Sequence, residues 1–523
     1  MSAMATPRVT PRSDRLPYNS RFRSAFCVTA SSLMLLAVTI PAVAEFEEIQ
    51  SRMTEFTLTN GMKFIVLERH QAPVVSCLIY AQVGSVDEPK GMSGLSHFIE
   101  HLAFKGTLTQ GTTDYAQERL ALAKEDRAFL ALREERWKGS EVDAPKLKQL
   151  EEEFKAAQKE ASRFVVPNGF FDPIRRAGGR WFSAAAGADN TAYYCSFPSN
   201  AIEVWFCVES DRFLSPVFRQ FYQEREVIIE ERRTMVENSP RGKLWDAFYA
   251  IAFRAHPYGT PILGHLSDLQ DLSRPEAAAF FKIHYVPSNL IAVMVGDVVP
   301  QRAQQLAQAY FGRMPCAPKP EPLRTVEPPP DGERRVVLRL PAQRTIYVGY
   351  RRPGAGHPDD AVYEIICALL AEGSSSRLQR RLITETKVAT DVRIVAKAPG
   401  HKYPRPLVFC VRTAPDHSNE EVEAVLEAEL RRLQDEPVEQ EELMGTKRRK
   451  HAGLMGELGN NFQAAGALAF AQGLTGDWRN FFRRFERLEA VTSEDIQRVA
   501  RQTFDPKLRA VGVIEPVGPA KTK

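Results

Sequence analysis

The chain has 523 residues, of which 44% are hydrophobic and 26% are charged, and this composition excludes a disordered or fibrous protein. Its formal net charge of +4 arises entirely within the first 44 residues, where five arginines face a single aspartate. The remaining chain is therefore neutral. A neutral body offers no basic footprint for nucleic acid and no polybasic patch for a membrane surface, so neither partner is expected.

Residues 1–44 have the composition of an export signal. Several arginines precede an apolar run that starts at Ala25 and ends in Ala-Val-Ala, and small residues at these last positions suit signal peptidase. A transmembrane anchor is the alternative, but the run is short and contains Ser, Thr and Pro. We therefore expect cleavage near Ala44/Glu45 and an exported mature chain without a stable membrane anchor.

The mature region opens with a predicted strand pair over 62–68 and 74–84, where Val, Ile and aromatic residues are enriched and turn residues lie between. A helix is predicted over 91–107. Residues 116–165 are rich in Ala, Leu, Glu, Lys and Arg with Leu and Phe at helical spacing, and they predict a helical hairpin inserted into the main fold. The elements predicted next are a strand over 193–199, helices over 200–213 and 217–238, and a strand over 291–298.

Residues 315–334 are dominated by Pro and charge, and they predict a linker. The second half then repeats the order of the first, with two strands, a Gly-containing loop and an apolar helix over 359–372. This repetition suggests a duplicated α+β unit. Where the first copy has His-Phe-Ile-Glu-His at 97–101, the second has only apolar residues at 365–369, so metal chemistry is expected in one half alone.

His97 and His101 are one helical turn apart and share a face, so both imidazoles can reach one metal ion. Zinc takes about four N, S or O ligands and leaves one position open in a catalytic site. Glu100 lies beside the two histidines, where a carboxylate can take a proton from water. Because His is scarce, at 10 of 523 residues, a chance surface cluster is the weaker reading. The sequence predicts one Zn2+ with His97 and His101 as ligands and Glu100 as general base.

A third ligand is expected from the charged helix over 217–238. Glu224 and Glu231 are seven residues apart and lie within about 20° on one helical face, and Val227 and Ile228 between them are predicted to be buried. Glu231 would then bind the metal, and Glu224 would hold a ligand histidine. A solvated charged face is the alternative for any single carboxylate here, and the competing candidates are Glu226, Glu230 and Glu237.

The sequence around these residues resembles that of the pitrilysin/insulinase family of zinc metallopeptidases, whose inverted HxxEH motif is typical of the inverzincins. The resemblance extends over about 50–515 and is carried by residues 94–107, 224–231, 256–261 and 285–290. It implies an α+β fold and zinc-dependent endopeptidase activity on short or unfolded peptides. The implied domains are an N-terminal zinc-bearing domain over 45–314 and a homologous non-zinc domain over 335–523. Each would be a mainly antiparallel sheet with helices packed on one face.

The resemblance also assigns roles to single residues. In the family the third ligand is the last Glu of a motif that begins here at Glu224. This position selects Glu231 over Glu230 as the ligand. The first Glu of the motif, here Glu224, is an auxiliary catalytic residue in the family. The interval from His101 to Glu231 is longer than usual in the family, and the hairpin over 116–165 accounts for the excess.

Two departures from the family pattern concern substrate binding. The family usually has an Asn near the edge strand that receives the substrate backbone, and the aligned residue here is Ser183, followed by Ala184. Both are expected to contact the substrate. In the second half an Arg and a Tyr that contact substrate in the family are replaced by Ile383 and Thr390.

Members of the family enclose the substrate in a closed chamber built from four homologous domains, whereas this chain has two. The resemblance therefore implies a heterodimer with a homologous two-domain subunit that carries the missing Arg and Tyr, with a homodimer as second choice. The export signal and the bacterial resemblance together imply a periplasmic location. Two alternatives remain open at this point: a non-catalytic or weakly active subunit of a heterodimeric peptidase, and a maturation protease for a peptide-derived cofactor.

Overall fold

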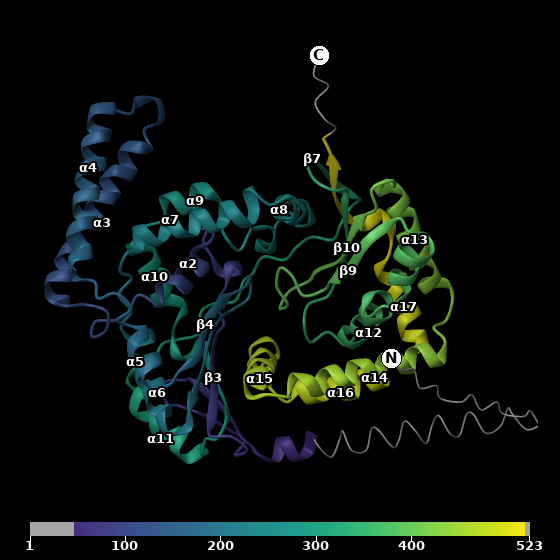
Figure 1. Cartoon of the computed structure of the whole chain (residues 1–523), viewed down its shortest axis with the longest axis horizontal. Coiled ribbons are helices and arrows are strands. Elements are labelled where there is room, and N and C mark those ends of the chain that lie inside the picture. The colour runs from purple at the N-terminus through teal and green to yellow at the C-terminus, as the bar shows by residue number, and fades with distance from the viewer. Residues whose placement is uncertain (1–45, 518–523) are drawn as a thin grey trace, which may run out of the picture. The chain divides into compact units, whose positions relative to one another are not determined.

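The computed structural model describes residues 46–517, so the predicted export signal over 1–44 lies outside the described residues. Among residues 46–517, no helix is long and apolar enough to cross a membrane. From Thr54 onward the described chain contains two sheets, each with its own set of helices (Figure 1).

The first sheet has six strands in the order β1-β2-β6-β3-β5-β4, so β4 is an edge strand. β2 and β6 are parallel, and the pairs that link β6, β3, β5 and β4 are antiparallel. The strands are β1 (Met53–Thr57), β2 (Lys63–Glu68), β3 (Val74–Ala81), β4 (Arg180–Ala186), β5 (Thr191–Pro198) and β6 (Leu290–Gly296).

The helices of this half lie between and after these strands. They are α2 (Leu95–Leu102), α3 (Tyr115–Arg136), α4 (Ala144–Ala161), α5 (Phe171–Arg176), α6 (Ile202–Leu214), α7 (Phe221–Arg232), α8 (Pro240–Ala252), α9 (Leu266–Asp271), α10 (Arg274–His284) and α11 (Pro300–Tyr310). A π-helical turn, Arg233–Glu237, continues α7.

The second sheet has five strands in the order β7-β11-β8-β10-β9. They are β7 (Arg334–Leu340), β8 (Thr345–Arg352), β9 (Ala389–Val395), β10 (Arg405–Thr413) and β11 (Ala510–Pro516). The helices are α12 (Asp360–Ala371), α13 (Asn419–Asp435), α14 (Gln440–Glu457), α15 (Asn461–Thr475), α16 (Asn480–Ala490) and α17 (Ser493–Thr503), with a π-helical segment over Gln379–Glu385.

The two sheets share one topology. If β1 is set aside, the first sheet reads β2-β6-β3-β5-β4 and the second β7-β11-β8-β10-β9, so each strand has a counterpart in chain order. In both sheets the last strand of the half pairs in parallel with the first, and the other pairs are antiparallel. The predicted α+β duplication with two mainly antiparallel sheets is therefore confirmed.

The hairpin predicted over 116–165 corresponds to α3 and α4, which lie side by side (Figure 1). Each helix begins after an aspartate whose carboxylate accepts a backbone N–H of the first turn, Asp114 for α3 and Asp143 for α4. A fully buried ion pair between Arg219 and Glu118, at 2.6 Å, ties the start of α3 to the loop before α7. The hairpin is thus anchored to the segment that leads into the helix with Glu224 and Glu231.

The prediction that helices cover one face of each sheet needs an addition, because each sheet receives on its other face a helix from the opposite half. Val75, Cys77 and Ile79 of β3 face the main core, whereas Tyr80 faces α15 of the second half, where its ring lies 5.4 Å from that of Phe470. Conversely, α8 of the first half packs on β7 and β11 of the second sheet.

Glycines make these two contacts close. A Cβ at Gly473 of α15 would lie 2.3 Å from the Tyr80 ring, and a Cβ at Gly349 of β8 would lie 2.5 Å from the ring of Phe248 in α8. The packing of α15 and α8 on the sheets of the opposite halves therefore requires glycine at these two positions as well as apolar side chains around them.

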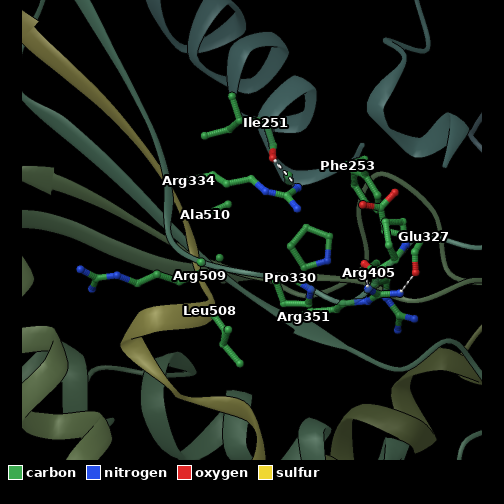
Figure 2. A pocket seen from close by; sticks show the side chains of 15 residues that line it. Ile251, Phe253, Glu327, Pro330, Arg334, Arg351, Arg405, Leu508, Arg509 and Ala510 are labelled. Carbon is green, nitrogen blue, oxygen red and sulfur yellow. Dashed lines mark hydrogen bonds between the residues drawn. The ribbon is translucent and has the colours of Figure 1, made fainter. Parts of the chain in front are cut away.

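The segment over 315–333 contains no helix or strand, as expected for a linker, but it is firmly attached. The carboxylate of Glu327 is buried and accepts the backbone N–H groups of residues 254–256 at 2.9 Å each. Arg351 of β8 donates to two linker carbonyls. Figure 2 shows Glu327 and Arg351 beside a pocket that Arg334 also lines. None of the predicted metal ligands lines this pocket.

Candidate metal centre

The helix α2 is fixed at its N-terminus by a carboxylate and a glycine. Glu88 accepts the backbone N–H groups of Gly94 and Ser96 at 2.8 and 2.6 Å, which satisfies two amides that have no partner inside the helix. Gly94 has φ +88, and a Cβ there would lie 2.9–3.0 Å from residues 263–269, so this turn favours glycine. The apolar face of α2, with Leu95, Phe98, Ile99 and Leu102, is completely buried.

The remaining surface of α2 presents His97, Glu100 and His101 toward α7. The rings of Phe98 in α2 and Phe221 in α7 stack with centroids 4.3 Å apart, which holds the two helices together. The candidate ligand atoms of His97, His101 and Glu231 all lie within 4.8 Å of one another. The structure therefore brings the three predicted ligands to one point.

The distances between these atoms suit an ion better than direct hydrogen bonds. The Nε2 atoms of His97 and His101 are 3.8 and 3.6 Å from Oε2 of Glu231, beyond hydrogen-bonding distance. With metal–ligand bonds of about 2.0–2.2 Å, two ligands of a tetrahedral zinc site lie about 3.4 Å apart. The Nδ1 atom of His97 is buried and has no hydrogen-bond partner among residues 46–517. Two imidazoles and a carboxylate are a donor set of catalytic zinc sites, so these residues fit zinc.

The protonation of His97 agrees with a ligand role. Burial and, to a lesser extent, the neighbouring His101 lower the pKa of His97 to about 4. His97 is therefore neutral near pH 7, the form in which imidazole binds metals.

Glu224 holds His101 from the side opposite Glu231. Oε1 of Glu224 is 2.9 Å from Nδ1 of His101, and its other oxygen forms an ion pair with Lys105. Burial opposes ionisation of both groups, but the mutual hydrogen bond and charges outweigh it, so the pKa of His101 is raised and that of Glu224 is lowered. A carboxylate bonded to the second nitrogen of a ligand histidine fixes the orientation of the ring.

Glu100 lies next to the cluster and is bound to the edge strand. Its Oε2 accepts the backbone N–H of Ala186, the last residue of β4, at 2.9 Å. Burial, opposed by His101 and by this hydrogen bond, raises the pKa of Glu100. The predicted base therefore lies at the junction of the metal ligands and β4.

The competing carboxylates of the α7 region point elsewhere. Glu226 and Glu230 are exposed and are paired with Arg225 and Arg233, respectively. Glu237 lies beyond α7 in the π-helical turn. The prediction that Val227 and Ile228 are both buried is wrong in part, since Ile228 is completely buried but Val227 is 52% exposed. The buried face of α7 centres on Phe221, Arg225, Ile228 and Arg232, and Val227 lies on the side of the helix away from them.

The residues that the resemblance assigned to substrate lie at two sheet edges. Ser183 and Ala184 are in β4, the edge strand of the first sheet, and Ser183 pairs with Tyr194 of β5. Thr390 is exposed in β9, the edge strand of the second sheet, and Ile383 lies in the π-helical segment before it. The nearby arginines are engaged in ion pairs, Arg377 with Glu442 and both Arg380 and Arg381 with Glu385.

Two contacts at this site were not predicted from the sequence. Lys105 pairs with Glu224, and its position one turn after His101 is a signal that helical spacing could have given. The N–H of Ala186 that binds Glu100 carried no such signal, because it depends on where β4 ends.

Two family models match the chain. The model described as "Insulinase (Peptidase family M16)" matches residues 63–136, and the model described as "Peptidase M16 inactive domain" matches residues 271–450. Over these two segments the chain therefore resembles the insulinase family, peptidase family M16.

Several similar proteins carry the name zinc protease. The chain is 25% identical over 488 residues to the zinc protease PqqE of Helicobacter pylori. This match covers 90% of this chain and 94% of that protein. It is 24% identical over 332 residues to an uncharacterized zinc protease of Mycobacterium tuberculosis, with 62% of each chain covered.

Solved structures show the same fold. A protease from Helicobacter pylori has a TM-score of 0.74 at 22% identity, with 89% of this chain and 99% of that chain covered. The periplasmic protease PqqL from Escherichia coli has a TM-score of 0.67 at 16% identity. This chain covers 49% of that protein, about half its length, whereas 90% of this chain is matched.

Proposed function

We propose that the chain is a zinc-dependent endopeptidase that hydrolyses short or unfolded peptides. The observation that carries the proposal is the convergence of His97, His101 and Glu231 within 4.8 Å, with the carboxylate of Glu100 beside them at the end of an edge strand. The names of the curated relatives support the use of zinc.

In this proposal metal binding, proton transfer and orientation of a ligand are carried out by different residues. His97, His101 and Glu231 would hold a zinc ion, which when bound supplies Lewis acidity toward a carbonyl oxygen and toward water. Glu100 takes a proton from water on its carboxylate and returns it to the amine that leaves, because its raised pKa brings it closer to the working pH. Glu224 keeps the His101 ring in place through Nδ1.

The edge strand β4 offers a binding mode for the peptide. Its outer edge is not paired with another strand of the described sheet, so an extended peptide can add to it through main-chain hydrogen bonds. Ser183 and Ala184 lie on this strand, and Glu100 lies at its end next to Ala186. A peptide bound along β4 would thus reach the base at one end. Such a mode requires an unfolded substrate, since only a free strand can be added.

The test separates metal binding from proton transfer. Glu100→Gln should keep one zinc per chain, measured by elemental analysis, and lose hydrolysis of a quenched fluorescent peptide by at least about 100-fold, because only the proton acceptor is removed. His101→Ala should lose both zinc and activity. Glu226→Ala, on the exposed face of α7, is the matched control and should change neither. Near-normal turnover in Glu100→Gln would refute the assigned mechanism.

We further propose that the active form is a heterodimer with a homologous two-domain subunit. The match to only about half of PqqL is consistent with a chain that supplies one half of a larger assembly, and Ile383 and Thr390 replace two side chains that the family uses for substrate. The isolated chain should then be weakly active. Mixing it with a co-exported homologue should raise the rate, whereas full activity alone would favour a homodimer or a monomer. The predicted signal over 1–44 and the periplasmic neighbour PqqL support a periplasmic location.

A further inference from the structure

The edge strand β4 contains a β-bulge at Trp181. Arg180 pairs with Ser196 and Ser183 pairs with Tyr194, so three steps along β4 correspond to two along β5. Trp181 takes up the extra residue with φ +55, a left-handed conformation that bulky residues rarely adopt. Bulges and left-handed residues of this kind redirect a side chain, and they are frequent beside functional sites.

Trp181 is 77% exposed, which is unusual for the largest apolar side chain. Trp137 provides a comparison, because it is 61% exposed but donates to Asp271 and lies under the guanidinium of Arg133. No ring or cation of residues 46–517 makes such a contact with Trp181. Its neighbour Phe182 is directed to the core, where it packs against the rings of Phe104, Phe170 and Phe171. The bulge thus separates two adjacent aromatic side chains, one packed against the core and one exposed.

The exposed side chains that follow Trp181 along β4 are small. Ser183 and Ala185, the other exposed residues toward the end of β4, have short side chains. Tyr194, opposite Ser183, packs edge-on against Phe462 of α15 at 5.1 Å, and Phe462 is itself 38% exposed. Trp181 is therefore the one large apolar group exposed on β4, at the end of the strand away from Glu100.

We propose that Trp181 determines specificity by packing against a bulky apolar side chain of a peptide bound along β4. This inference rests on the proposed function. Trp181 and Ala186 are five residues apart, and the bulge shortens this stretch by one step where β4 pairs with β5. A peptide that keeps the register of β5 would span the same stretch in four steps. The contact would therefore fall about four residues along the peptide from the residue opposite Ala186, roughly 13 Å from the base at about 3.3 Å per residue.

The experiment uses quenched fluorescent peptides that are identical except for one Leu or Ser, placed in turn at each position around the cleaved bond. Wild-type protein should prefer Leu at a position about four residues from that bond, by about 10-fold in kcat/KM, the value expected when a leucine side chain is buried. Trp181→Phe should keep most of this preference. Trp181→Asn, which tolerates the left-handed backbone, should reduce it to about twofold or less.

Trp137→Ala is the matched control, because it removes an exposed tryptophan of the α3–α4 hairpin. It should keep the wild-type preference. An unchanged Leu preference in Trp181→Asn, in a protein that hydrolyses both peptides and retains the wild-type thermal midpoint, would overturn this inference and leave the proposed function intact.

A binding measurement distinguishes a failure of the Trp181 proposal from a failure of the proposed peptidase function. Fluorescence anisotropy with labelled Leu and Ser peptides would be compared for Glu100→Gln and for Glu100→Gln combined with Trp181→Asn. Tighter binding of the Leu peptide that is lost in the double variant supports the Trp181 contact even if wild-type protein shows no hydrolysis. Absence of both hydrolysis and peptide binding would overturn the proposed function and the role of Trp181 with it.

Discussion

Replacement of Glu224 by Ala tests the proposed zinc site without removing a proposed ligand. The carboxylate makes two bonds, one to Nδ1 of His101 at 2.9 Å and one to Lys105. A hydrogen bond to a charged group contributes about 1.5–3 kcal/mol. If the bond to His101 acts only through the orientation of the imidazole, its loss should weaken zinc binding by about 10–100-fold, which corresponds to about 1.4–2.7 kcal/mol. The two ranges agree, so we expect Glu224→Ala to retain a measurable but weaker site.

Zinc affinity would be measured by competition with a chromophoric chelator, and peptide hydrolysis at saturating zinc. Lys105→Met should have a smaller effect than Glu224→Ala, because His101 keeps its partner. Glu226 lies two residues after Glu224 but on the exposed face of α7, so Glu226→Ala should leave the zinc Kd unchanged. A Kd within twofold of wild type in Glu224→Ala, or an equal loss in Glu226→Ala, would refute the argument that Glu224 acts through His101.

The remaining predictions concern the third ligand and the exchanged helix. Glu231→Ala should strip or greatly loosen zinc while Glu230→Ala retains it, measured as zinc per chain after dialysis; equal loss in the two variants would contradict the geometry. Gly473→Ala should destabilise the protein by about 1–3 kcal/mol in chemical denaturation, because its Cβ would lie 2.3 Å from the buried Tyr80 ring. Gly466→Ala in the same helix has nothing within 4 Å and should be neutral or stabilising by up to about 1 kcal/mol, so a loss of stability there would argue against the packing of α15.

Local pattern was sufficient for the part of the site that one helix contains. His97, Glu100 and His101 follow from spacing on α2, and the structure places them where that spacing predicts. Glu231 needed more, because several carboxylates on α7 have similar sequence surroundings. The family resemblance selected it, and the structure adds that its carboxylate lies beside His97 and His101 of α2. Spacing alone also misplaced Val227, which is exposed because α7 meets the core along a narrower stripe than the apolar pair suggested.

Features that depend on distant segments were beyond the reach of the sequence. The repeat of strands and helices predicted a duplicated fold, but not that β6 and β11 would each insert between earlier strands. The bulge at Trp181 carries no glycine, the residue that usually marks a left-handed position. The buried carboxylate of Glu327 was hidden in a segment that its Pro and charge content identified only as a linker.

The exchange of α8 and α15 between the two sheets has a consequence for how the gene could be divided. Each half lends the other a helix, so a fragment that ends in the linker would leave Leu244 and Phe248 of α8 without the second sheet, and β3 without α15. Separately produced fragments should be insoluble or aggregate, whereas fragments made together should assemble without a covalent bond between them. A nick between residues 315 and 326 should for the same reason leave the pair associated. The two copies of this duplicated unit have become interdependent, so neither can be inherited or tested as a free-standing module.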